Sequence, residues 1–144
     1  MIYIKRILGV DLGEKRTGIA LSDLTGTLAG GLELIETPDG GLNKLAQKIT
    51  DKAKKYNIGE IVLGYPVNMN GTIGDKAKRA EVFRSKLESL NPDIKVILFD
   101  ERLSTSLAHV YMNNTGIKGR NRKQKIDMLS AQIILQDYIN QNKK

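Results

Sequence analysis

Two acidic motifs directly follow apolar stretches of the chain. Asp11 comes after the stretch 2–10, and Asp100 and Glu101 come after the stretch 95–99. If these stretches are strands of one sheet, both motifs lie at the edge where open α/β sheets form their sites. A carboxylate at the margin of a core is costly without a partner. We therefore expect Asp11 and Glu101 to converge and bind a cation. A local turn at Asp11 and a solvated Glu101–Arg102 ion pair are the structural alternatives.

A third acid, Asp127, stands at the expected start of the last helix. A purely structural role is open to it, because an acid in the first helical turn stabilises the macrodipole by about 0.3–1 kcal/mol. The basic residues just before it have the wrong sign for that dipole, and an external polyanion explains them better. Three carboxylates around one or two Mg²⁺ or Mn²⁺ ions form the arrangement that activates water for phosphodiester hydrolysis.

The net charge of +7 is concentrated in a small part of the sequence. The chain holds 23 basic and 16 acidic residues, and 16 basic residues remain when the five of segment 118–125 and the terminal Lys143 and Lys144 are set aside. A localised basic segment is typical of nucleic-acid binding. The five residues are Lys118, Arg120, Arg122, Lys123 and Lys125.

Further candidates for substrate contact lie beside the acidic motifs. We expect Gly13 to let a phosphate approach the backbone, and Lys15, Arg16 and Arg102 to contact nucleic acid. Asn68 stands in a glycine-rich segment that enters a helix N-terminus, where a phosphate would be stabilised, and an Asn-Gly turn explains the same residues.

The composition excludes several kinds of chemistry. With no Cys and a single His, the chain has no thiolate nucleophile and no multi-histidine metal site. The N-terminus does not follow the signal-peptide pattern, and no apolar run reaches the length of about 18 residues that a membrane span needs. We expect a cytoplasmic protein that makes no membrane contact.

The expected secondary structure is that of one α/β domain covering 1–144. Strands that alternate with helices in the second half predict parallel pairing, and the opening three strands predict an antiparallel meander. A mixed sheet with helices on both faces follows. The expected strands are 2–10, 18–22, 31–36, 61–65 and 95–100, and the expected helices are 42–56, 73–90, 104–114 and 126–140.

Four motifs together resemble the bacterial YqgF family, also called RuvX. They are GVDLGEKRTGIA at 9–20, VLGYPVNMNGT at 62–72, DERLST at 100–105 and KIDMLSAQIILQ at 125–136. The resemblance spans nearly the whole chain. It implies an RNase H-like fold, a five-stranded sheet of order 3-2-1-4-5 with strand 2 antiparallel, and nuclease activity at the 5′ end of pre-16S rRNA. By motif, Asp11, Glu101 and Asp127 would be the catalytic, metal-binding carboxylates.

One feature departs from the related Holliday junction resolvases, in which the second carboxylate follows strand four. Here that strand ends in Gly64-Tyr65-Pro66-Val67-Asn68 without an acid. The replacement must come from strand five, two strand spacings or roughly 10 Å from strand one. Glu101 must therefore reach inward, or the loop that carries it must fold back.

The sequence is compatible with three functions. The leading hypothesis is an endonuclease that needs Mg²⁺ or Mn²⁺ and acts on structured RNA, the small-subunit rRNA precursor. The second is a homodimeric Holliday junction resolvase that acts on branched DNA, and the third is a non-catalytic RNA-binding factor in ribosome assembly. A sugar-kinase-like function is disfavoured, because such enzymes close two lobes around ATP and 144 residues supply one.

Overall fold

The computed structural model describes the backbone of residues 5–101 and 119–142, and the side chains of 5–101 and 129–142. The expected helix 104–114 lies outside these residues. In chain order the elements are β1 (Arg6–Asp11), β2 (Arg16–Ser22), β3 (Ala29–Glu36), α1 (Gly41–Lys55), β4 (Ile58–Tyr65), α2 (Asp75–Leu90), β5 (Lys95–Asp100) and α4 (Gly119–Gln141).

The five strands form one mixed sheet of order β3-β2-β1-β4-β5, which confirms the predicted order. β2 pairs antiparallel with both β1 and β3, whereas β4 pairs parallel with both β1 and β5. The carboxyl ends of β1, β4 and β5 therefore meet at one edge. Asp11 ends β1 there, and Tyr65 of β4 pairs with Asp100 of β5.

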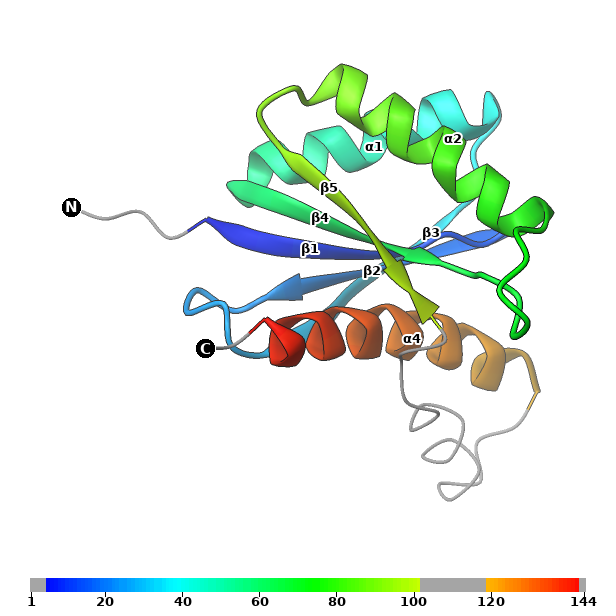
Figure 1. Cartoon of the computed structure of the whole chain (residues 1–144). Coiled ribbons are helices and arrows are strands. Elements are labelled where there is room, and N and C mark those ends of the chain that lie inside the picture. The colour runs from blue at the N-terminus through cyan, green and yellow to red at the C-terminus, as the bar shows by residue number, and fades with distance from the viewer. Residues whose placement is uncertain (1–4, 102–118, 143–144) are drawn as a thin grey trace.

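Helices cover both faces of the sheet, as predicted. α1 and α2 pack together on one face, and α4 lies alone among the described helices on the other (Figure 1). The first face buries Leu8, Ile19 and Leu63 beneath the two helices. The second buries Ala20, Val62 and Phe99 beneath α4. Alternate residues of each strand thus serve two separate cores, as the period of two in a strand requires.

A buried polar contact ties α1 to the end of α2. Asn91, the residue that caps α2, donates from Nδ2 to the hydroxyl of Thr50 in α1 at 2.8 Å and to the carbonyl of Leu87 at 2.9 Å. Both Asn91 and Thr50 are buried. Pro92 follows, and the helix ends before it, as residues that precede proline disfavour helical backbone.

The last helix begins earlier than predicted. α4 starts at Gly119, whereas the apolar spacing placed its start at Ile126. Residues 119–125 contain no apolar side chain, so a search for hydrophobic periodicity cannot detect these turns. Asp127 therefore lies in the interior of α4, not in its first turn, which holds no acid. The macrodipole explanation for Asp127 is wrong.

Two glutamines fix the position of α4 along the sheet. Gln132 donates to the carbonyl of Ala29 at 3.1 Å, and Gln136 accepts from the amide of Ala29 at 2.8 Å. Gln136 also donates to the carbonyl of Thr27 at 3.1 Å. These bonds join the helix to the start of β3, more than a hundred residues away in sequence. No helix within the described ranges is long and apolar enough to cross a membrane.

Replacing Asn91 by Ala is expected to lower the free energy of unfolding by about 1–3 kcal/mol. The substitution leaves the buried Thr50 hydroxyl without this donor and opens a small cavity. Chemical denaturation followed by circular dichroism measures the change. Asn140→Ala is the matched control, because Asn140 is exposed, and it should stay within about 0.5 kcal/mol of wild type. Equal effects of the two substitutions would contradict the role given to Asn91.

Candidate active site

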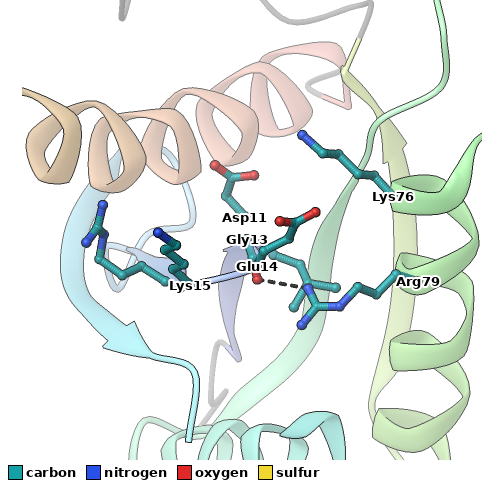
Figure 2. A pocket seen from close by; sticks show the side chains of 8 residues that line it. Asp11, Gly13, Glu14, Lys15, Lys76 and Arg79 are labelled. Carbon is teal, nitrogen blue, oxygen red and sulfur yellow. Dashed lines mark hydrogen bonds between the residues drawn. The ribbon is translucent and has the colours of Figure 1, made fainter.

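Asp11 is placed at the sheet edge by the register of β1. It pairs with Gly18 of β2, and its neighbour Val10 points into the core beneath α1 and α2. Because side chains alternate along a strand, Asp11 lies on the opposite face, which α4 covers. Figure 2 shows its carboxylate directed from the end of β1 toward the ribbon of α4.

Glu101 reaches Asp11 by crossing β4 at Gly64. A Cβ atom added to Gly64 would lie 2.5 Å from Oε1 of Glu101 and 3.2 Å from its carboxyl carbon. The side chain of Glu101 therefore occupies the space that any larger residue at position 64 would fill. The carboxyl group is hydrogen-bonded to Asp11. Glu101 can therefore reach inward across β4 because Gly64 has no side chain.

The proximity of the two acids changes the chemistry of Glu101. Burial, the negative charge of Asp11 and the hydrogen bond to Asp11 raise the pKa of Glu101 from 4.5 to about 8. Asp100 raises this pKa further, and Lys76 of α2 opposes the shift. In the absence of a cation the pair shares a proton, which protonated Glu101 donates to the carboxylate of Asp11.

The third predicted ligand, Asp127, belongs to α4, and its side chain lies outside the described residues. Its place on the helix can still be assigned from its neighbours. It precedes Ala131 by four residues and Ile134 by seven, so its backbone lies about one turn and two turns before them. Ala131 packs on Gly9 of β1, and Ile134 packs on Gly64 of β4.

The direction of α4 places Asp127 near the sheet edge that holds the two acids. Tyr138 donates to Glu60 near the start of β4, whereas Ile134 contacts Gly64 near its end. α4 therefore runs antiparallel to β4, and the turn before Ala131 leads toward the carboxyl ends of the strands. The described side chains alone contain no group of three or more acids or histidines that could hold a metal ion.

A pocket of about 270 Å³ opens beside Asp11, between the β1–β2 hairpin and α2 (Figure 2). Arg79 of α2 fixes the hairpin by donating from Nη1 to the carbonyl of Gly13 at 2.8 Å. The turn has no room for a side chain at Gly13, where a Cβ would overlap the carbonyl oxygen of Arg16. The residues around the pocket are Asp11, Leu12, Gly13, Glu14, Lys15, Arg16, Lys76 and Arg79.

The predicted nucleic-acid contacts divide into three groups. Lys15 and Arg16 line this pocket. Asn68 does not, and its side chain donates to the hydroxyl of Thr72 at 2.9 Å within its own loop. The rest fall outside the described side chains. They are Arg102, Lys118, Arg120, Arg122, Lys123 and Lys125.

Sequence reasoning missed three residues that shape this site. Lys76 and Arg79 stand three positions apart in α2, on one face and in its first two turns, directly after the loop that leaves β4. That spacing and position were a readable signal, because this loop leaves the same sheet edge as Asp11. Gly64 carried no such signal, since its importance depends on what another strand places beside it.

Comparison with known proteins assigns the family. A family model described as "RuvX: Holliday junction resolvase" matches residues 5–141. The chain belongs to the RuvX family. Two curated relatives named "Putative pre-16S rRNA nuclease" support this membership. The protein of Ruminiclostridium cellulolyticum is 43% identical over 142 residues, which is 96% of this chain and 99% of that protein. The protein of Bacillus licheniformis is 40% identical over 134 residues, with 93% and 96% covered.

Solved structures confirm the fold of this RuvX-family chain. RuvC of Thermus thermophilus in complex with a Holliday junction substrate matches with a TM-score of 0.60 at 11% identity, covering 96% of each chain. The fowlpox virus resolvase in complex with Holliday junction DNA matches with a TM-score of 0.57 at 13% identity, covering 96% of this chain and 99% of that one. The predicted RNase H-like architecture is therefore confirmed.

The raised pKa of Glu101 predicts an unusual dependence of stability on pH. Between pH 4.5 and about 8 the folded chain holds a proton on Glu101 that the unfolded chain has lost. The contribution of Glu101 to stability is therefore fully present below this window and is lost as pH rises through it, by at most about 1.4 kcal/mol per pH unit. Glu101→Gln keeps the donor to Asp11 and removes the titration.

In EDTA we expect Glu101→Gln to be more stable than wild type at pH 8, with the difference shrinking toward pH 4.5. Thermal unfolding across this range measures it. Glu36→Gln, which removes an exposed carboxylate at the end of β3, controls for the loss of charge. Parallel pH profiles for wild type and Glu101→Gln would refute the shared proton.

Gly64→Ala is expected to separate the two acids. The new Cβ would collide with Oε1 of Glu101, so Glu101 must leave Asp11 and its pKa must fall toward its ordinary value. At low pH, where wild type keeps the Asp11–Glu101 hydrogen bond, the variant should lose about 1 kcal/mol of stability, because the displaced atoms are the ends of flexible side chains, and its pH profile should be flatter. Adding Glu101→Ala should recover part of this loss, and strict additivity of the two substitutions would contradict the contact.

Proposed function

We propose that this chain is a divalent-metal-dependent endonuclease that hydrolyses phosphodiester bonds in structured RNA, at the 5′ end of pre-16S rRNA in the cytoplasm. The observation that carries the proposal is the half-buried, hydrogen-bonded Asp11–Glu101 pair at the sheet edge, beside a predominantly basic pocket. A carboxyl pair kept in a costly arrangement at the edge of a core fits a functional role better than a structural one. Family membership and the names of the relatives point to the same activity.

The donor set suits a hard divalent cation. Mg²⁺ and Mn²⁺ take oxygen ligands, and two acidic side chains that must share a proton when alone would instead share such an ion. Asp11, Glu101 and Asp127 would hold it. Bound there, Mg²⁺ or Mn²⁺ would activate a water molecule and stabilise negative charge on the phosphate.

The chain's own residues provide binding and orientation. Glu101 releases its proton when it becomes a ligand, so metal affinity should rise as pH approaches 8. Lys15 and Arg16 attract the phosphate backbone on the hairpin side of Asp11. The basic residues at 118–125 precede Asp127 and would hold the substrate on the α4 side. The acids would thus lie between two basic flanks.

A second candidate function is cleavage of branched DNA. The family model is described as a Holliday junction resolvase, and the fold matches two resolvases. Each copy of this chain would carry one carboxylate site. Symmetric cleavage of two strands would therefore need a homodimer, with one site for each strand.

The decisive experiment compares wild type with Asp11→Asn on labelled pre-16S leader RNA and on a four-way DNA junction, with Mg²⁺ or Mn²⁺. We expect wild type to cut the RNA and Asp11→Asn to lose more than about 100-fold in rate, because a ligand of the ion is removed. Asp39→Asn is the matched control, since Asp39 is exposed in the loop before α1.

The other outcomes each assign a different function. Cutting of the junction but not of the RNA would identify a resolvase. A third outcome is that neither wild type nor Asp11→Asn cleaves the RNA, while both bind it equally well and in a salt-sensitive way. That result would identify a non-catalytic assembly factor.

A further inference from the structure

The pocket beside Asp11 is basic because of residues that are distant in sequence. The hairpin supplies Lys15 and Arg16, and α2 supplies Lys76 and Arg79. Against these four stand the two acids of the lining, one of which is Asp11 itself. With Asp11 engaged at the carboxylate site, the remaining lining has a clear excess of positive charge. Such a pocket suits an anionic group more than a neutral one.

Arg79 is held in place before any ligand arrives. Its bond to the carbonyl of Gly13 fixes the guanidinium against the hairpin. A guanidinium carries five N–H donors in a rigid fork, so further donors remain available to an anion once one is used. Because this residue also supports the hairpin, its substitution would affect both folding and binding.

Lys76 has a position that its own helix does not favour. It lies in the first turn of α2, where the macrodipole makes a cation less stable. It is exposed, and it lines the pocket while acting electrostatically on Glu101. Figure 2 shows its side chain extending from α2 toward Asp11 and the hairpin. Lys76 therefore lies beside both the carboxylate pair and the pocket.

The size of the pocket limits what it can hold. Its volume of about 270 Å³ lies below the range of roughly 300–1,000 Å³ that is usual for small-molecule sites. One phosphate with part of its sugar fits this space better than an independent ligand. The opening adjoins the site where the proposed cleavage takes place, so the natural occupant is the substrate strand itself.

We propose that Lys76 and Arg79 bind the backbone phosphate next to the cleaved one, so that the substrate strand passes from the carboxylates into the pocket between α2 and the hairpin. This assignment rests on the proposed nuclease function and adds to it a defined path for the strand. Lys76 is a binding residue for that phosphate. Arg79 both binds it and positions the hairpin.

The test measures binding in EDTA, so that it does not depend on cleavage. The probe is a fluorescent RNA stem-loop with a single-stranded 5′ extension, titrated at several salt concentrations. We expect Lys76→Gln to weaken binding about tenfold, the value of one charge-assisted contact. The slope of log K against log[salt] should fall by about 0.7–0.9. Lys78→Gln, an equally exposed lysine of the same helix that does not line the pocket, should bind within about twofold of wild type.

Neutral methylphosphonate linkages, introduced one at a time, then locate the contact. One linkage should weaken binding of wild type and of Lys78→Gln more than binding of Lys76→Gln, in which only Arg79 remains to contact that phosphate, and Lys76→Arg should restore the full sensitivity. Arg79→Gln should weaken binding and also lower thermal stability, because the Gly13 carbonyl loses its donor.

The binding experiment tests the phosphate subsite separately from the nuclease function. Position-specific binding without any cleavage would leave the phosphate subsite standing and refute the nuclease. Equal RNA binding by wild type and Lys76→Gln, with only the pH profile of stability altered, would show that Lys76 merely balances the charge of the acid pair, and would overturn the subsite. Absence of any RNA binding by wild type would overturn it as well.

Discussion

Two acidic side chains from non-adjacent strands must meet, and much of this molecule is arranged around that constraint. Asp11 ends β1 and Glu101 follows β5, with β4 between them. Contact is possible only because Gly64 presents no side chain at the crossing point. The same glycine also receives Ile134 of α4, so the helix packs close to the edge where the acids lie. At the crossing point β4 thus contributes Gly64, which has no side chain, and not a further acid.

The acid pair lowers the stability of the fold, and packing elsewhere must offset this loss. A half-buried carboxyl beside another carboxylate keeps its proton well above the usual pH, which is why the pKa of Glu101 rises to about 8. Lys76 opposes the shift and adds positive charge beside the pair. The two cores on either face of the sheet provide the compensating burial, and α4 is held in register by Gln132 and Gln136. A rigid scaffold that supports an unfavourable arrangement of charges is common at functional sites.

Folding gathers positive charge at one place although the totals of basic and acidic residues do not indicate it. Outside segment 118–125 and the C-terminal lysines, basic and acidic residues are equal in number. The hairpin and α2 nevertheless bring four basic residues together around one pocket. Lys76 and Arg79 are separated from Lys15 by about sixty residues, so no local pattern links them. The proposed strand path into the pocket depends on this convergence.

Within the described residues, the sequence by itself determined the element types, the sheet order and the two acids that meet at the sheet edge. These depend on local spacing and on motifs shared with a family, and both can be recognised in the sequence without a structure. It could not mark the first turns of α4, because residues 119–125 have no apolar side chains. Only the tertiary structure decided that Glu101 crosses at Gly64 and that Lys76 and Arg79 face the hairpin. The physical reason is that a contact between distant segments depends on strand order, register and the volume of the residues between them, and none of these is a property of either segment alone.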